Sequence, residues 1–143
     1  MTDWLIDKSA LVRLGATPDD RLWLDRIDKG LVRISTPTLL EAGFSARNAS
    51  HWTAVVDGAP IAWMPLEYVT PQAERRAVEV QRLLAERGQH RAPSIPDLLI
   101  AAIAEVGALT VLHVDKDFDL IADITQQPME RLRTNPAPHS GVK

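Results

Sequence analysis

The sequence contains no cysteine, and this absence excludes disulfides, thiolate metal sites and a cysteine nucleophile. It also has no apolar run near the roughly 20 residues that a bilayer-spanning helix needs. The N-terminal stretch MTDWLIDKSALVRLG carries Asp3 and only a short apolar run before Asp7, so it does not have the form of a signal peptide. From these absences we expect a cytoplasmic protein without a membrane segment.

An excess of basic charge is missing as well. The formal net charge is −3, so the overall charge does not indicate nucleic-acid binding, although it leaves room for a local basic patch. The 143 residues are 45% hydrophobic and 24% charged, as in ordinary globular proteins. No linker or repeat divides the chain, so we expect one domain over residues 1–133. Residues 134–143, with Pro136 and Pro138 among small polar residues, are expected to form a disordered tail.

Apolar runs and helix start signals alternate along the chain. Strands are predicted at 4–6, 31–35, 61–66, 110–114 and 129–133. Helices are predicted between them at 17–30, 36–47, 70–88 and 97–106, and a threonine followed by a proline opens the first three. Strands that alternate with helices are typical of a parallel sheet covered on both faces. The sequence therefore predicts an α/β fold.

Acidic residues follow two of the predicted strands. Asp7 comes directly after residues 4–6, and Asp115 comes directly after residues 110–114, with Asp117 and Asp119 at every second position beyond it. Ligands of open α/β sheets bind at the carboxyl ends of the strands, so we expect Asp7 and Asp115 to face one crevice. Carboxylates this close raise one another's pKa and repel each other.

The run D-x-D-x-D has simpler explanations than a functional site. Asp115 and Asp117 could lie in a solvated turn. A calcium-binding loop is a sharper alternative, but it needs glycine at the sixth position and glutamate at the twelfth, where this sequence has Leu120 and Gln126. The calcium loop is therefore excluded, and Asp119 is expected to be a solvated residue of the following turn.

Asp7 and Asp97 also have structural alternatives. Asp7 with Ser9 fits a turn or the cap of a short helix. Asp97 follows Ser94 by three positions, a spacing typical of a capping box in which the acid faces the amide groups of the helix start. From the sequence, both alternatives stay open beside the functional one.

Glu41 lies in a largely apolar helix, where burying an unpaired carboxylate is costly. A position at the edge of a pocket and a pair with Arg47 are the alternatives. Together, Asp7, Glu41, Asp97 and Asp115 would form a pocket that repels itself unless a divalent cation neutralises it. Oxygen ligands without cysteine suit Mg2+ or Mn2+ and not zinc, and such ions commonly serve phosphoryl chemistry by activating a water.

The segments that carry these acids resemble those of PIN-domain ribonucleases, and most closely those of VapC toxins from VapBC toxin–antitoxin pairs. They are LIDKSAL, STPTLLEAGFSAR and PDLLIAAIAEVGALTVLHVDKDFD, and together they span nearly the whole chain. The resemblance implies a parallel sheet with helices on both faces. It also implies a catalytic set of Asp7, Glu41, Asp97, Asp115 and Asp117, in which Asp7, Asp97 and Asp115 hold the metal ion and Ser9 supports the first aspartate.

The same resemblance implies a function. The expected activity is endonucleolytic cleavage of RNA, often tRNA or a ribosomal RNA loop, with Mg2+ or with Mn2+ in its place, and the result is arrested translation. The expected partners are the RNA, a VapB-type antitoxin whose C-terminal segment blocks the site, and a second copy in a homodimer within a larger complex, in a prokaryotic cytoplasm. The alternatives are a degenerate PIN domain that only binds, another metal-dependent nuclease, and a receiver-type signalling domain, which would need a late lysine that we do not find.

Two positions depart from the commonest pattern of the family. Lys8 replaces the frequent threonine or serine after the first aspartate, and it could point away or lend its charge to a phosphate. His113 stands where a threonine often precedes the last acidic pair, and we expect a strand histidine with satisfied hydrogen bonds and not a ligand. Neither departure removes a carboxylate of the expected site.

Basic and aromatic residues indicate surfaces for partners. We predict RNA contacts at Arg75, Arg76, Arg87 and Arg91, with Arg82, His90, Arg131 and Arg133 as further candidates. The alternative is a solvated helix face that is paired internally through Glu79 and Glu86. Trp4 and Trp23 are expected in the core, and Trp52 is expected at an interface with an antitoxin or a second copy.

Overall fold

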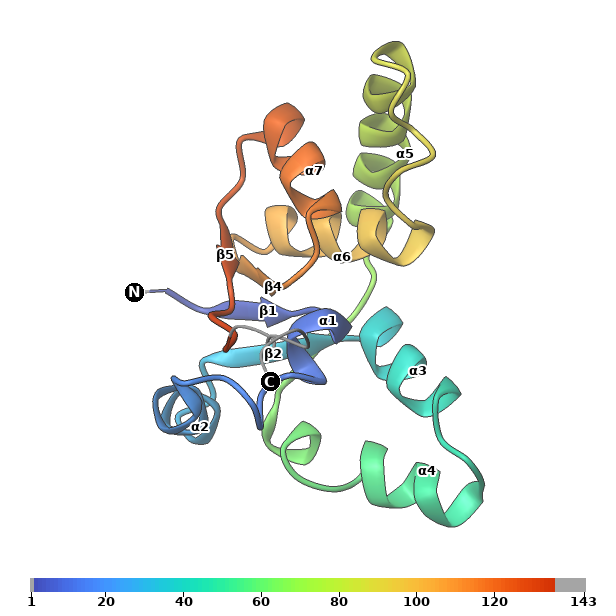
Figure 1. Cartoon of the computed structure of the whole chain (residues 1–143). Helices are drawn as coiled ribbons and strands as arrows, with labels where there is room; N and C mark the ends of the chain where they lie inside the picture. The colour runs from blue at the N-terminus through green and yellow to red at the C-terminus, as the bar shows by residue number, and fades with distance from the viewer. Residues whose placement is uncertain (1, 136–143) are drawn as a thin grey trace, which may run out of the picture.

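The computed structural model describes residues 2–135, in which five strands form one parallel sheet in the order β3-β2-β1-β4-β5 (Figure 1). The strands are β1 (Trp4–Ile6), β2 (Val32–Ser35), β3 (Leu66–Glu67), β4 (Thr110–His113) and β5 (Met129–Arg131). The predicted α/β fold is therefore confirmed. The predicted tail, 134–143, lies outside the described residues except for Thr134 and Asn135.

Helices cover both faces of this sheet. They are α1 (Lys8–Leu11), α2 (Asp20–Asp28), α3 (Thr36–Phe44), α4 (Ala49–Val56), α5 (Pro71–Glu86), α6 (Ile95–Val106) and α7 (Asp117–Thr125), with a 3-10 turn η1 (Ile61–Trp63). Figure 1 shows α5, α6 and α7 on one side of the sheet and α2 and α4 on the other. Among the described residues, no helix is long and apolar enough to cross a bilayer.

The two faces of the sheet contribute to two separate cores. Leu5 and Val111 pack with α5, α6 and α7 in one core. Trp4, Ile6 and Leu112 pack with α1, α2 and η1 in the other. Because successive side chains of a strand point to opposite faces, strands buried on both sides must be apolar at every position. This explains why β1 and β4 appear in the sequence as continuous apolar runs.

The prediction that Trp4 and Trp23 belong to the core is confirmed. Their side chains are 7% and 2% exposed, and their rings meet edge to face with centroids 5.2 Å apart. The guanidinium of Arg26 lies 4.5 Å from the centroid of each ring. A cation over an aromatic face is attracted by the ring, so Arg26 fixes the packing of α2 against β1.

The predicted strand at 61–66 is wrong. Residues Ile61–Trp63 form a 3-10 turn, and only Leu66–Glu67 pairs with β2. Pro65 explains the short strand, because proline has no N–H to donate; its carbonyl oxygen accepts from the N–H of Ile34 at 2.9 Å. The strand therefore forms at the end of the apolar run and not along its length.

Helices α4 and α7 were not predicted, and the short helix α1 was predicted only as one of the alternatives for Asp7 and Ser9. Helix α1 begins directly after Asp7, α4 covers the segment around Trp52, and α7 begins at Asp117. Asp119, expected in a turn, lies in the first turn of α7, where its exposed carboxylate faces the positive end of the helix dipole. The aspartates after β4 therefore start a helix, and Phe118 and Ile121 of that helix are fully buried.

Candidate metal centre

Asp7 and Asp115 meet because their strands are neighbours in the sheet. β1 and β4 pair in parallel with Ile6 opposite Leu112, and the N–H of Asp7 donates to the carbonyl of Leu112 at 2.9 Å. The segments that follow β1 and β4 therefore leave the sheet at the same edge, as predicted from the sequence. The Asp7 side chain is 4% exposed, so its carboxylate is held inside the protein and not in bulk water.

Ser9 fixes the carboxylate of Asp7 in place. The hydroxyl of Ser9 donates to Asp7 Oδ2 at 2.6 Å, and its backbone N–H donates to the same oxygen at 3.0 Å. The Ser9 hydroxyl also accepts from the N–H of Val114 at 2.8 Å, which ties α1 to the end of β4. Asp7 is thus the N-cap of α1, and the capping alternative is confirmed together with its place at the sheet edge.

Asp97 is held by the capping box predicted from its spacing to Ser94. The N–H of Asp97 donates to the Ser94 hydroxyl at 3.2 Å, and the N–H of Ser94 approaches Asp97 Oδ2 at 3.4 Å. The Asp97 side chain is only 8% exposed. The capping role and a ligand role are compatible, because a carboxylate has two oxygens and more lone pairs than the cap uses.

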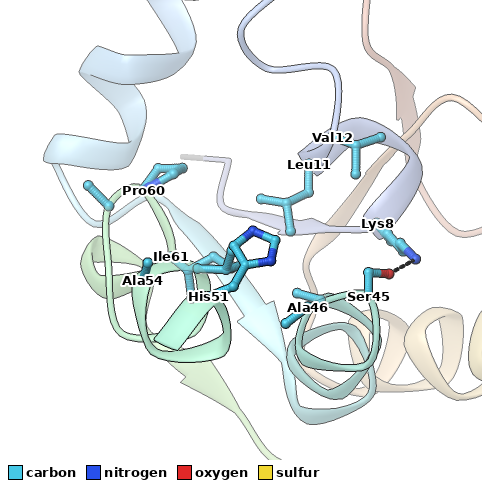
Figure 2. Close-up of a pocket in the computed structure, with 12 residues that line it drawn as sticks. Lys8, Leu11, Val12, Ser45, Ala46, His51, Ala54, Pro60 and Ile61 are labelled. Atoms are coloured by element: carbon cyan, nitrogen blue, oxygen red, sulfur yellow. Dashed lines mark hydrogen bonds between the residues drawn. The ribbon is translucent and has the colours of Figure 1, made fainter. Parts of the chain in front are cut away.

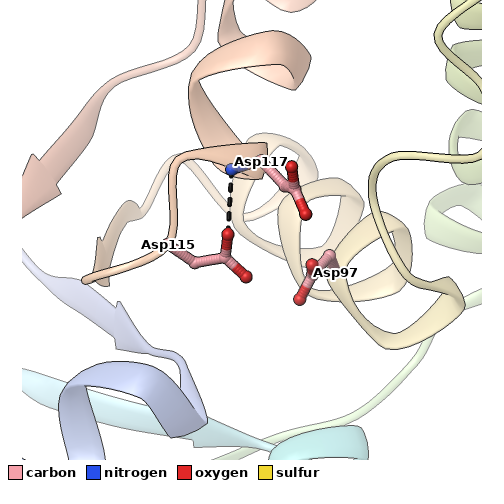
Figure 3. Close-up of side chains that lie close together, drawn as sticks. All are labelled: Asp97, Asp115 and Asp117. Atoms are coloured by element: carbon pink, nitrogen blue, oxygen red, sulfur yellow. Dashed lines mark hydrogen bonds between the residues drawn. The ribbon is translucent and has the colours of Figure 1, made fainter.

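Three of the acids form the tightest carboxylate group in the described part of the chain. Single oxygens of Asp97, Asp115 and Asp117 all lie within 4.8 Å of one another. Figure 3 shows these side chains pointing toward one another, Asp97 from α6 and the other two from the β4–α7 junction. The N–H of Asp117 donates to Asp115 Oδ1 at 2.9 Å, which sets their relative orientation. Asp7, expected as a ligand, is not part of this close group.

All five predicted acids nevertheless line one cleft of about 520 Å³. Four segments that are far apart in the sequence contribute to it, with Asp7, Glu41, Asp97, Asp115 and Asp117 on its walls and Ser9 beside them. The structure thus brings together every acid that the sequence analysis selected. The close group at one end of the cleft includes Asp117 where the sequence analysis placed Asp7.

The acids disturb one another electrostatically. Burial, and then the charges of Asp7 and Asp115, together raise the pKa of Asp97 to about 7. Burial and the charge of Asp115 raise the pKa of Asp117 above its ordinary value. Without a cation the cleft therefore tends to keep a proton, and a bound divalent cation would replace that proton and relieve the repulsion.

Glu41 is a second acid of the cleft whose surroundings fit a bound cation. Its Oε1 atom is buried and has no hydrogen-bond partner among the described residues. Burial and then the charge of Asp7 raise the pKa of Glu41, while the charge of Lys8 partly offsets them. The pair with Arg47, considered from the sequence, is not among the ion pairs of residues 2–135. Buried carboxylate oxygens normally have a partner, so this one fits a site for a cation or its bound water.

The two departures from the family pattern have defined places. The Lys8 ammonium donates to the Ser45 hydroxyl at 2.8 Å while its side chain borders the cleft. His113 is 1% exposed, its Nδ1 accepts from the N–H of Asp115 at 3.1 Å, and its ring lies 5.0 Å from that of Phe118. Burial lowers the pKa of His113, so the ring stays neutral and supports the backbone of Asp115. The prediction of a satisfied strand histidine is confirmed.

The predicted basic contacts divide into two groups. Arg91 lines the acidic cleft, whereas Arg75 and Arg76 line a separate hollow between α5 and α6. Arg76 is held by Glu105, at 2.7 Å from its Nε, and by Glu79. The internal pairing considered for this helix face is therefore confirmed for Arg76, and in the same way Arg82 pairs with Glu86 and Arg133 with Asp19.

Arg13 also lines the cleft, and the sequence analysis did not select it. It follows Ser9 by four positions, and its Nη1 donates to the carbonyl of Ser9 at 2.6 Å. Helical spacing from Ser9 was the signal that could have found it, but α1 is only four residues long and was considered only as an alternative to a turn. Arg13 and Arg91 are thus the two arginines that border the acids among the described residues.

Apolar hollows adjoin the cleft on two sides. One, of about 380 Å³, lies between α1, α3, α4 and η1 and is lined by Leu11, His51, Pro60 and Ile61, with Lys8 at its border (Figure 2). Another, of about 680 Å³, lies between α3 and α6 and shares Glu41 and Lys8 with the cleft. At its edge Leu40 is 68% exposed and Phe44 is 91% exposed. Exposed apolar surface of this kind marks contact sites for partners.

Known proteins resemble this chain along most of its length. Residues 4–124 match the model of the PIN domain. Ribonuclease VapC2 of Mycobacterium tuberculosis (strain CDC 1551 / Oshkosh) is 59% identical over 138 residues, which cover 95% of this chain and 98% of the relative. Ribonuclease VapC51 of Mycobacterium tuberculosis (strain ATCC 25618 / H37Rv) is 42% identical over 127 residues, which cover 89% of this chain and 90% of the relative.

Solved structures share the fold at lower identity. The toxin–antitoxin complex VapBC from Salmonella typhimurium, bound to DNA, matches with a TM-score of 0.75 and 19% identity over 92% of this chain and 98% of that chain. VapC20 of Mycobacterium tuberculosis, described as a toxin that cleaves the sarcin-ricin loop, matches with a TM-score of 0.60 and 20% identity over 82% of this chain and 94% of that chain.

Proposed function

The chain belongs to the PIN domain family, in which its relatives are the ribonucleases named VapC, and we propose that it is a metal-dependent endoribonuclease and the toxin of a type II toxin–antitoxin pair. The observation that carries this proposal is the acidic cleft. Oxygens of Asp97, Asp115 and Asp117 lie within 4.8 Å of one another, beside the unpaired Oε1 of Glu41. An all-oxygen site of this kind fits a hard divalent cation.

Mg2+ is the proposed ion, with Mn2+ able to replace it, because both prefer carboxylate and water oxygens. Asp97 and Asp115 would hold it, with Asp117 as the third close carboxylate and Asp7 on the same cleft wall. When bound, the ion supplies a water of lowered pKa and offsets charge on the phosphate. Burial and the charges of Asp7 and Asp115 raise the pKa of Asp97 to about 7, and a bound ion would offset the repulsion from these two charges.

The remaining side chains position and protect these groups. Ser9 donates two hydrogen bonds to Asp7 Oδ2. The other carboxylate oxygen of Asp7, Oδ1, is therefore the one available to the cleft. The Glu41 carboxylate also lines the cleft, and its pKa is raised by burial and by the charge of Asp7, so it can accept a proton from a water that attacks the phosphate. No side-chain nucleophile is needed for this hydrolysis, which agrees with the absence of cysteine.

The test compares RNA cleavage by the wild type with cleavage by Asp97→Asn and Asp115→Asn in Mg2+ and in Mn2+. Both variants should lose cleavage by a factor of about 100 or more while they keep the wild-type circular dichroism spectrum, because each removes a charge that holds the ion. Asp123→Asn, an exposed acid on α7, serves as the matched control. Wild-type rates in a folded Asp97→Asn protein would disprove the assignment.

The substrate we propose is a structured RNA, either a tRNA or a ribosomal RNA loop. VapC20, which shares this fold, is described as cleaving the sarcin-ricin loop, but at 20% identity it supports only the choice of RNA to try first. Mapping RNA ends after brief expression would identify the substrate. A degenerate domain that only binds RNA would leave all ends intact, and a different metal-dependent nuclease would cut DNA as well.

We also propose a VapB-type antitoxin and a second copy of the chain as partners, in a prokaryotic cytoplasm. The apolar hollow between α1, α3, α4 and η1 lies beside the acidic cleft and shares Lys8 with it. An antitoxin segment bound there would reach and block the acids. The exposed Leu40 and Phe44 are a candidate face for the second copy. Light scattering of the purified chain, with and without the protein encoded beside it, would test both partners, and Leu40→Asp should weaken only the homodimer.

Among the predicted RNA contacts, Arg91 remains the best supported, because it lines the same cleft as the acids. Arg75, Arg76 and Arg87 are proposed only as outer contacts on α5 and its C-terminal end. Arg76 is the weakest of these, since Glu105 and Glu79 already use its guanidinium. Loss of salt-dependent RNA binding on Arg75→Gln or Arg87→Gln would support them.

A further inference from the structure

Two arginines border the acidic cleft without neutralising it. Arg13 follows α1, and Arg91 lies in the loop between α5 and α6. Both side chains are exposed, and neither forms an ion pair with a carboxylate in the part of the chain that the structure describes. Four arginines elsewhere, Arg33, Arg76, Arg82 and Arg133, do pair with an acid.

Arg13 is anchored next to the first acid. Its Nη1 donates to the carbonyl of Ser9 at 2.6 Å, and the hydroxyl of the same serine donates to Asp7 Oδ2 at 2.6 Å. Ser9 therefore sets the position of both the Arg13 guanidinium and the Asp7 carboxylate. A guanidinium has five N–H donors, so this single bond leaves four for a ligand at the mouth of the cleft.

Arg91 lies near another acid of the cleft. It precedes Ser94 by three positions, and Ser94 forms the capping box that holds Asp97. A backbone hydrogen bond from Ala92 to the carbonyl of Gln89, at 3.2 Å, makes the loop a tight turn at this point. Arg13 is thus one hydrogen bond from the serine that holds Asp7, and Arg91 lies three positions before the serine that caps the helix of Asp97.

The charges of the cleft explain why such cations are needed. Because no carboxylate among the described residues pairs with Arg13 or Arg91, both guanidinium groups are available to a ligand. An RNA strand carries one negative phosphate per nucleotide, and five carboxylates would repel it on approach. Cations on the rim offset this repulsion for the phosphates that lie outside the metal site.

We propose that Arg13 and Arg91 bind the RNA phosphates on either side of the scissile phosphate and so place that phosphate over the acidic group. This proposal rests on the proposed ribonuclease function and adds to it the residues that position the strand. Bidentate guanidinium–phosphate contacts are strong and directional, so two of them fix the register of a flexible strand. A single phosphate or a mononucleotide cannot use both contacts at once.

The experiment measures cleavage of bulk tRNA and of a mixed-sequence single-stranded RNA in Mn2+, over a range of RNA and salt concentrations. The variants are Arg13→Gln, Arg91→Gln and their combination. Arg21→Gln with Lys29→Gln, on the exposed side of α2, removes the same charge and is the matched control. Mn2+ binding by calorimetry and thermal unfolding are measured for every protein.

Each single variant should raise KM by about tenfold and leave kcat within about threefold, because a charged hydrogen bond to the substrate is lost. The slope of the logarithm of the RNA binding constant against the logarithm of salt concentration should become shallower by about 0.7 for each arginine removed. This is the change expected for one phosphate contact on a single strand. Arg→Lys at either position should restore most of the slope. The control pair should change neither quantity, and Mn2+ affinity should stay at the wild-type value.

Several results would overturn the proposal. If the double variant kept the KM and the salt slope of the control pair, the arginines would not contact RNA. If Mn2+ affinity fell together with cleavage, Arg13 would act through Ser9 and Asp7 as a structural residue. If the wild type cut no RNA in Mn2+, the proposed function itself would fail, and that outcome is recognised before any variant is compared.

Discussion

Asp97→Asn should make the metal-free protein markedly more stable at high pH than the wild type. Burial and two neighbouring charges raise the pKa of Asp97 from 3.8 to about 7 in the folded protein. The full difference corresponds to about 4 kcal/mol, and because the cleft is open to solvent on one side we expect roughly half of it, about 2 kcal/mol. Asparagine keeps the size of the side chain and cannot ionise.

The direction of the effect follows from proton binding. Between pH 3.8 and about 7 the folded wild type keeps the proton on Asp97, while the unfolded chain has lost it. The free energy of unfolding therefore falls as pH rises through this range and is level above it. Glu41 and Asp117 act in the same direction and His113 in the opposite one, but they are present in both proteins and largely cancel in the comparison.

The assay is urea unfolding of both proteins without metal at pH 5 and at pH 8. The stability of Asp97→Asn minus that of the wild type should rise by about 1.3 kcal/mol between these two values, because part of the range from pH 3.8 to about 7 already lies below pH 5. Asp123→Asn should show no such rise, because that side chain is exposed on α7. A difference that does not change with pH would refute the claim that Asp97 is the strained acid of the cleft.

Metal should reverse this order at pH 8. An ion that binds only the folded wild type adds about 2.7 kcal/mol at 100 times its dissociation constant, and protons compete with it at pH 5. At Mn2+ concentrations about 10 to 100 times the dissociation constant of the wild type, the free energy of unfolding of Asp97→Asn should rise much less, because one carboxylate of the close group is gone. Equal stabilisation of both proteins would place the ion somewhere other than beside Asp97.

Three further substitutions test neighbouring parts of the structure. Ser9→Ala should cost about 1–3 kcal/mol in urea unfolding and weaken Mn2+ binding in calorimetry, because it removes the hydroxyl that holds Asp7 and leaves a backbone N–H unpaired. Glu41→Gln should stabilise the metal-free protein at pH 8, because it removes a buried unpaired charge, and should reduce RNA cleavage if this carboxylate has the role proposed above. Gly43→Ala should cost about 1 kcal/mol and change tryptophan fluorescence, because a Cβ there would overlap the indole of Trp52.

Local signals predicted most of the fold. The runs that became β1, β2 and β4 are apolar at successive positions because both faces of the sheet are covered, and that pattern is visible without coordinates. A threonine followed by a proline predicted the starts of α3 and α5, and the spacing from Ser94 to Asp97 predicted the cap of α6, since capping bonds join residues only three positions apart. Such features depend on near neighbours in the sequence.

The errors came from elements whose form is decided by distant contacts. Helix α7 begins with acids that are equally suited to a turn, and the burial of Phe118 and Ile121 against α5 and α6 makes it a helix. The segment 61–66 is apolar enough for a strand, but pairing with β2 selects only Leu66 and Glu67. Propensity is a weak guide in short segments because packing with the rest of the chain overrides it.

The sequence by itself determined which carboxylates could form the site, because Asp7 and Asp115 end apolar strands and Asp97 opens a buried helix. Only the tertiary structure decided that Asp117 joins the close group and that Asp7 stays outside it. It also decided that Arg13 and Arg91 share the cleft while Arg76 is paired elsewhere. The physical reason is that these distances join segments brought together by strand pairing and helix packing, and no local pattern in the chain encodes a separation of a few ångströms across the sheet edge.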